Sequence, residues 1–143
     1  MIAEGIYTKI SSDSGITDRL ASYNFTTGVS SPAIFTIDVI PEDSGYPAII
    51  IDEDGGISEG SFGFKGANTY CTVRLYDDKD RTSLVVKDIA WDLYKLLDRS
   101  EITFPAGSGF YSAWVIASPP RKLSDIDGFP GYAIDLTINI FEE

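Results

Sequence analysis

The sequence feature that most constrains the fold is a regular alternation of apolar and polar residues over Gly131–Phe141. The apolar set is Ile134, Leu136, Ile138 and Ile140, and the polar set between them is Asp135, Thr137 and Asn139. Successive side chains of a strand point to opposite faces of a sheet, so this alternation predicts a strand with one buried and one wetter face, as in antiparallel sheets. Such a strand needs another layer to cover its apolar face.

The covering layer is predicted to be a helix over Asp78–Asp98. Its apolar residues recur at the i, i+3, i+4, i+7 spacing that marks one face of a helix, and they are Val86, Ile89, Ala90, Leu93, Leu96 and Leu97. Acidic residues precede this stripe (Asp77, Asp78 and Asp80), and basic residues follow it (Lys95 and Arg99). We expect the acids to form the N-terminal turn, because that arrangement complements the helix dipole.

Further elements follow from shorter patterns. Tyr70–Tyr76 and Tyr111–Ala117 are predicted strands, and in the first of them Cys71, Val73 and Leu75 share the buried face. A short N-terminal helix is expected from Ile2, Ile6 and Ile10, which recur every four residues and are followed by the stop signal Ser11–Gly15.

Two more predictions concern the region after that helix. One or two helical turns are expected over Thr17–Tyr23, capped by Thr17 or Asp18. Ile34–Ile40 and Tyr46–Asp52 are predicted strands, joined as a hairpin by the turn at Pro41–Gly45.

These elements predict the fold class. The chain has 143 residues, 43% of them hydrophobic, which suits one domain spanning residues 1–143 with a single core. We expect an α+β fold in which one antiparallel or mixed sheet is packed by the long amphipathic helix and the short N-terminal helix.

Composition excludes several classes of function. The chain has no histidine and one cysteine, so Ser-His-Asp and Cys-His catalysis and histidine-containing or cysteine-rich metal sites are absent. Asp125–Gly128 contains only a fragment of a calcium loop and is interpreted as a turn. We expect no catalytic residues, no metal and no cofactor.

The charge of the chain limits its partners. Its formal net charge is −11, which disfavours binding to nucleic acid phosphates and to anionic lipid. No signal peptide is expected at Met1–Gly5, and apolar runs such as Ala48–Ile51 are far shorter than the roughly 20 residues that cross a membrane.

The stretch Asp52–Asn68 has an unusual composition, with five glycines and four acids but also Ile57, Phe62 and Phe64. It could form a strand over Ile57–Phe64. It could equally form a long loop, and loops of that length are usually functional or disordered.

The order of segments resembles the tail-terminator, or tail-completion, proteins of long-tailed phages. The segments that carry the resemblance are Thr17–Leu20, Pro41–Asp43, Tyr46–Ile51, Cys71–Asp77, Trp91–Leu97 and Tyr132–Phe141. The resemblance covers nearly the whole chain. It implies a subunit of a six-membered ring that caps the tail tube, ends its polymerisation and meets the head connector, while DNA passes through without specific binding.

A ring of identical subunits needs apolar surface outside the core, and this need suggests candidate residues. Trp91, Tyr94, Trp114 and Arg74 are candidates for the subunit interface. An acidic lumen would repel DNA, and the candidates for a lumen or docking loop are Asp52, Glu53, Asp54, Glu59, Phe62 and Phe64.

Other functions remain open at this point. The expected partners are further copies of the chain, a tail tube protein and a head–tail connector, in a virion assembled in the host cytoplasm. A different head–tail joining or head-completion subunit is the first alternative. A small ligand-binding domain that uses the aromatic side chains as a platform is the second.

Overall fold

The computed structural model describes residues 2–26, 28–36, 40–53, 66–79, 82–103, 110–126 and 128–142. Its main sheet has seven strands in the order β3-β4-β5-β9-β7-β6, with β8 also paired to β9. The strands are β3 (Ile34–Phe35), β4 (Ala48–Glu53), β5 (Gly66–Tyr76), β6 (Ser100–Thr103), β7 (Phe110–Ala117), β8 (Arg121–Ile126) and β9 (Phe129–Glu142).

The strand with the alternating pattern, β9, lies at the centre of the sheet. It pairs with β5 along its length, with β8 over its first half and with β7 over its second half, always antiparallel. The four isoleucine and leucine side chains predicted to face inward are buried. The prediction of a half-buried antiparallel strand is therefore confirmed.

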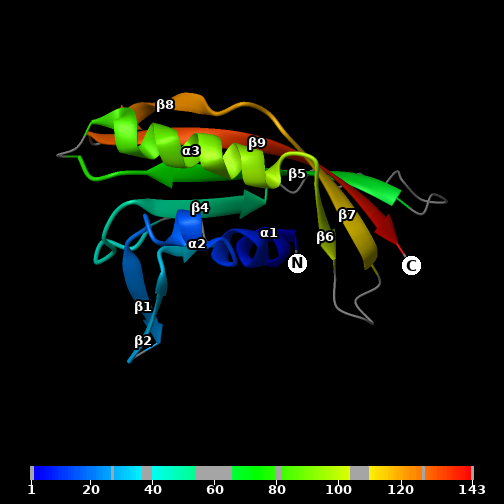
Figure 1. Ribbon diagram of the computed structural model, residues 1–143, viewed down its shortest axis with the longest axis horizontal. Coiled ribbons are helices and arrows are strands. Elements are labelled where there is room, and N and C mark those ends of the chain that lie inside the picture. Colours follow the sequence, from blue (N-terminus) through cyan, green and yellow to red (C-terminus); the bar gives the residue numbers. More distant parts are fainter. Residues whose placement is uncertain are drawn as a thin grey trace.

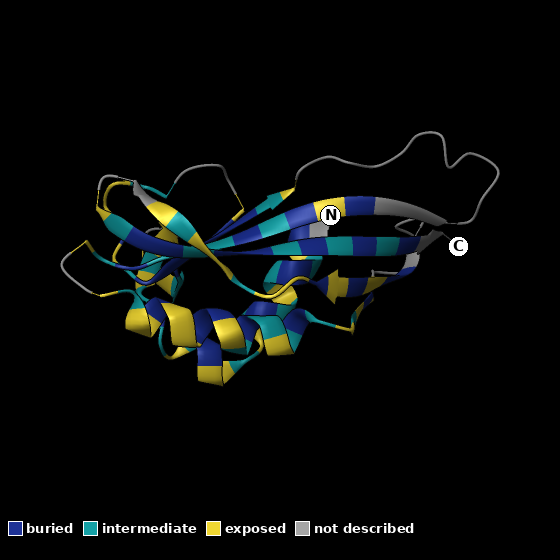
Figure 2. Ribbon diagram, turned by 90° about the horizontal axis from the view of Figure 1, so that it is seen from above, coloured by how far each residue is buried: buried dark blue, intermediate teal, exposed yellow. Residues whose placement is uncertain are grey.

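The helices cover one face of this sheet (Figures 1 and 2). The long helix α3 (Ser83–Leu97) packs against β9, and the N-terminal helix α1 (Ile2–Ser11) packs against β4 and β6. The core between the layers is formed by one face of each element, including Ile6, Leu93 and Ile138, all fully buried. This arrangement confirms the α+β class with a mixed sheet.

The start of the long helix differs from the prediction. Its N-cap is Thr82, and its first turn contains no acidic residue. Asp77 is instead fully buried, and its N–H donates to the carbonyl of Pro130 at 3.0 Å, which continues the contact between β5 and β9. Its Oδ1 accepts the N–H of Asp78, so this acidic pair closes the strand rather than opening the helix.

The end of the helix is fixed by a backbone conformation and by one hydrogen bond. Arg99 has a φ of 56°, the left-handed conformation that commonly terminates helices. The Asp98 carboxylate accepts the Ala117 N–H at 2.9 Å and so attaches the helix end to β7. The chain then enters β6, a strand that the sequence patterns did not predict.

The predicted hairpin between Ile34–Ile40 and Tyr46–Asp52 is wrong. The turn lies where it was expected, but β3 and β4 are parallel, with Ile34 opposite Ile49 and Phe35 opposite Ile50. Parallel strands need a connection of about a dozen residues or more, and residues 36–47 between β3 and β4 are enough for one. Residues 37–39 of the predicted strand Ile34–Ile40 lie outside the described residues.

The prediction of helical turns over Thr17–Tyr23 is also wrong in position. The short helix α2 occupies Ser14–Thr17, and Asp13 caps it by accepting the Ile16 N–H at 3.2 Å. The chain then forms β1 (Ser22–Thr26), which pairs antiparallel with β2 (Val29–Pro32). These strands form a two-stranded ribbon, separate from the main sheet, that projects from the body of the molecule (Figure 1).

Candidate assembly surfaces

The face of the sheet opposite the helices carries an exposed apolar patch. Tyr70 on β5 and Trp114 and Ile116 on β7 are 48%, 40% and 46% exposed. The ladder connects them: Thr137 of β9 lies opposite both Tyr70 and Ile116, and Asn139 lies opposite Trp114. We call Tyr70, Trp114 and Ile116 the open-face patch.

An ion pair borders this patch. Arg121 Nε donates to Asp135 Oδ2 at 2.9 Å, and the Thr72 hydroxyl donates to Asp135 Oδ1 at 3.3 Å. The hydrogen bond from Arg121 is the main cause that lowers the pKa of Asp135, and partial burial opposes it. The carboxylate is therefore charged and held in place near neutral pH.

The structure brings together two residues that the sequence assigned to different surfaces. Asp52 of β4 and Arg74 of β5 form an ion pair at 3.0 Å, and both side chains are 29% exposed. Asp52 lies opposite Thr72 in the ladder, so this pair occupies the same face of the sheet as the open-face patch. Its mutual neutralisation leaves little net charge there.

Glu53, the other described acid of the predicted lumen loop, points to the helix face. Its Oε1 accepts the N–H of Ala3 in the first turn of α1. The positive end of the helix dipole also stabilises a negatively charged side chain in this position. The remaining candidates for the lumen or docking loop, Asp54, Glu59, Phe62 and Phe64, lie outside the described residues.

A second exposed surface lies on the outer side of α3. The rings of Trp91 and Tyr94 meet edge-on with their centroids 5.7 Å apart. They can meet because residues three apart lie on the same face of a helix. Leu84 and Val85 are exposed on the same helix. Trp91 and Tyr94 are thus together, but they are on the opposite side of the sheet from Trp114.

A third exposed surface belongs to the ribbon. Phe25 and Val29 are 47% and 54% exposed. At the base of the ribbon, the Tyr23 ring packs edge-on against Phe25 at 5.0 Å and against Phe35 at 5.2 Å. Phe35, Ala33 and Ala48 form a small second core beneath these rings, which anchors the ribbon to β3 and β4.

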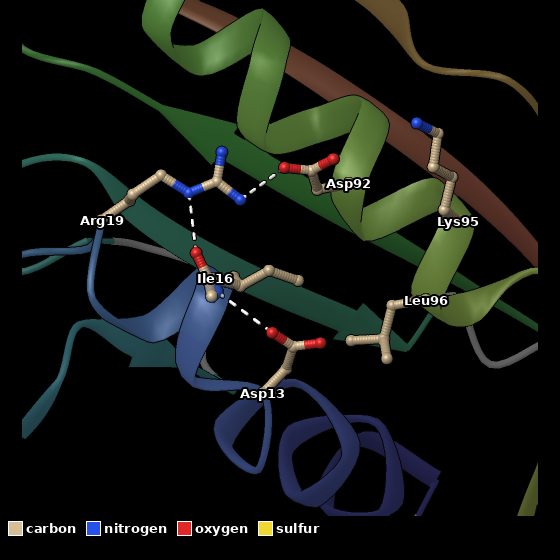
Figure 3. A pocket seen from close by; sticks show the side chains of 7 residues that line it. Asp13, Ile16, Arg19, Asp92, Lys95 and Leu96 are labelled. Carbon is tan, nitrogen blue, oxygen red and sulfur yellow. Dashed lines mark hydrogen bonds and ion pairs between the residues drawn. The ribbon is translucent and has the colours of Figure 1, made fainter.

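A pocket of about 350 Å³ lies between α2 and α3 (Figure 3). Arg19 spans it: Nη2 meets Asp92 Oδ2 at 2.6 Å, and Nε donates to the Gly15 carbonyl at 2.8 Å. Lys95 and Leu96 complete its wall. The Arg19–Asp92 ion pair connects the segment that follows α2 to α3 across this pocket.

Several exposed apolar residues were not singled out from the sequence. Tyr70 and Ile116 could have been found, because each takes the outward position in a predicted strand. Phe25 and Val29 could not, because the ribbon itself was not predicted. Among the described residues, no group of three or more acids or cysteines is placed to hold a metal ion, and no helix is long and apolar enough to span a membrane.

The fold resembles that of a known virion component. A chain from the structure titled "Virion of native gene transfer agent (GTA) particle" matches with a TM-score of 0.63 and 13% sequence identity, over 99% of this chain and 93% of that one. At this identity the match establishes a shared fold over the full length. No model of a known protein family matches the chain, and neither does any curated protein sequence.

Proposed function

We propose that this chain is a non-enzymatic structural subunit of a virion that acts as a tail terminator. In this proposal, several copies, most simply six, form a ring on the head-proximal end of the tail tube. The ring ends tube polymerisation and joins the tube to the head connector. Its partners are copies of itself, the tail tube protein and the connector protein, and assembly takes place in the host cytoplasm.

One observation carries the proposal above all others. The match to a chain of a gene transfer agent virion extends over nearly the whole of both chains, so the similarity is one of complete folds rather than of a common substructure. The segments that resemble tail terminators span the same length, from Thr17 to Phe141. The fold and the segment order therefore both support a structural protein of a virion, and the segment order adds the tail-terminator role.

The surfaces support an assembly role. The described part of the chain exposes large apolar side chains in three separate places: the open-face patch, the outer side of α3 and the ribbon. Exposed apolar groups that gather in patches commonly mark protein interfaces. A ring subunit requires two different contact surfaces, because each copy touches a neighbour on either side.

The charge supports passage of DNA without binding. A ring built from subunits with a net charge of −11 presents an acidic surface, which repels phosphate. Asp54 and Glu59 remain our candidates for the lumen or docking loop, together with Phe62 and Phe64. Asp52 and Glu53 are weaker candidates, because each already has a partner within the subunit.

Deletion of the gene from its phage or particle genome tests the proposal. We expect electron micrographs of the deletion mutant to show tail tubes of abnormal, variable length without heads, and expression of the chain from a plasmid to restore normal tails. Normal-length tails that fail to attach to heads would instead support a head–tail joining subunit. Infectious particles of normal form would contradict both functions.

A further inference from the structure

We propose that the β1–β2 ribbon of one copy docks on the open-face patch of the neighbouring copy. This inference rests on the proposed ring and specifies its subunit contact. The occupant of the patch is thus a second copy of this chain, and the contact is made by Phe25 and Val29 on one side and by Tyr70, Trp114 and Ile116 on the other.

The first argument is the charge of the ribbon. Ser22–Pro32 contains no charged residue, in a chain of which 23% of residues are charged and whose net charge is −11. Two copies of so acidic a protein repel each other at most approaches. An uncharged projecting segment can reach a neighbour without bringing like charges together or burying an ion.

The second argument is the exposure of the ribbon. An isolated two-stranded ribbon is marginally stable in water. Here its base is held by the contacts of Tyr23 with Phe35, whereas Val29, next to the turn at Gly28, remains more than half exposed. Contact with a second surface would bury Phe25 and Val29 and would stabilise the ribbon in its projecting form.

The third argument is the match in chemistry between ribbon and patch. Thr137 and Asn139, which lie between the strands of the patch, are uncharged, and Arg121 and Asp135, which border the patch, are paired to each other. The exposed Glu101 lies opposite Trp114 on the edge strand β6, so it can stay in water at the rim of the contact. The outer side of α3 is a less suitable docking surface for the ribbon. Its exposed Leu84 and Trp91 are separated by Lys87 and Asp88, which are exposed too and would have to be buried.

The fourth argument is position. The ribbon and β7 lie towards opposite ends of the molecule (Figure 1), so the ribbon cannot cover the patch of its own subunit. A contact between two different surfaces of identical subunits is heterologous, and repetition of it produces a closed ring or a filament. The placement of the two surfaces therefore suits the proposed assembly.

Cysteine cross-linking tests the contact directly. Val29→Cys and Ile116→Cys place reactive thiols on the ribbon and on the patch, and the natural Cys71 is buried. We expect a mixture of these two variants, treated with a short bismaleimide, to give a covalent dimer that neither variant gives alone. The matched control replaces Ile116→Cys by Leu84→Cys, on the exposed side of α3, and should give no dimer with Val29→Cys.

The result that overturns this inference differs from the one that overturns the function. A ring seen by electron microscopy, in which the mixture forms no more dimer than the Leu84→Cys control, would disprove the ribbon contact and leave the tail-terminator proposal intact. A cross-linked dimer together with normal tails in the deletion mutant would do the opposite.

A pair of substitutions that introduces opposite charges on the two surfaces gives a second, independent readout. Val29→Glu should weaken self-association about tenfold or more, measured by sedimentation, because a carboxylate would be buried without a partner. Ile116→Lys in the same chain should restore most of that loss, because the two new charges would meet across the contact. Unchanged association of the Val29→Glu variant would overturn the proposal.

Discussion

At the scale of single residues, the ring of Tyr76 on β5 packs closely over Gly131 of β9. The two residues are opposite each other in the ladder, and a Cβ added to Gly131 would lie 2.7 Å from the Tyr76 ring. The tyrosine ring therefore occupies the space that any other side chain would need. Glycine within a strand often marks such a close approach.

This contact predicts that Gly131→Ala destabilises the fold by about 1–3 kcal/mol, the usual penalty for overpacking a well-filled site. Equilibrium unfolding in urea measures the change. The same substitution in a Tyr76→Ala background should cost clearly less, because the ring is gone and the two sites are coupled. Equal penalties in both backgrounds would show that the ring does not cause the strain.

The second prediction at this scale concerns pH. Arg121 lowers the pKa of Asp135 below its usual value of 3.8, so the folded state binds this proton less tightly than the unfolded state does. The resulting stabilisation is present above the usual pKa and is lost as pH falls through the lowered one. Both side chains are about half exposed, at 55% and 47%, so we expect less than about 1 kcal/mol.

An NMR titration of the side-chain carboxyl carbons tests this directly. The midpoint for Asp135 should lie below 3.8 in the natural chain and should rise when Arg121→Gln removes the guanidinium. A midpoint that the Arg121 substitution leaves unchanged would contradict the assignment of the ion pair as the main cause.

At the scale of secondary-structure elements, the two sides of the long helix differ strongly in how far they are buried. Leu93 is fully buried against the sheet, whereas Leu84, on the same helix, is 66% exposed. Leu93→Ala should reduce the free energy of unfolding by about 2–5 kcal/mol, because it leaves a cavity in the core. Leu84→Ala is the matched control and should change it by less than about 0.5 kcal/mol.

Denaturant unfolding of the two variants decides between a helix that belongs to the core and one that packs mainly against a partner. A small loss for Leu93→Ala would contradict the packing of α3 on β9. A loss for Leu84→Ala that appears only at high protein concentration would place the outer side of α3 in a subunit contact instead.

The elements that the sequence predicted correctly are those in which apolar side chains recur at one regular spacing over many residues. The apolar stripes of α3 and β9 are set by local geometry, since each residue's face depends only on its position along the element. The buried positions of β5 were predicted for the same reason, and β7 was predicted as a strand. Even so, the start of α3 was misplaced, because Asp77 is held by Pro130, a residue remote in sequence.

Pairing between elements was less predictable, because it depends on contacts distant in sequence. Nothing local in Ile34–Phe35 distinguishes a hairpin strand from one that pairs parallel with β4. The candidate surfaces show the same limit. Trp91 and Trp114 were predicted as candidates for one subunit interface, and both are exposed. Their placement on opposite sides of the sheet follows from the topology, and so does the pairing of Asp52 with Arg74.

At the scale of the whole molecule, the uneven distribution of charge is the feature that matters for the proposed assembly. The net charge of −11 is carried by a chain whose ribbon has no charged residue. Its open-face patch is bordered by the Arg121–Asp135 ion pair on one side and by Glu101 of the edge strand β6 on the other. In the proposed contact, long-range repulsion between copies therefore opposes an apolar attraction between ribbon and patch. The balance of the two depends on the ionic strength.

Self-association should accordingly strengthen with salt. Raising the ionic strength from about 0.01 M to 1 M shortens the Debye length from about 30 Å to 3 Å, which screens the repulsion between whole subunits but leaves apolar contact intact. Sedimentation at several salt concentrations measures the change, and urea unfolding under the same conditions separates assembly from folding. Association that weakens with added salt would mean that ion pairs hold the subunits together. In that case Arg74, Asp52 and Glu53 would be the first residues to substitute.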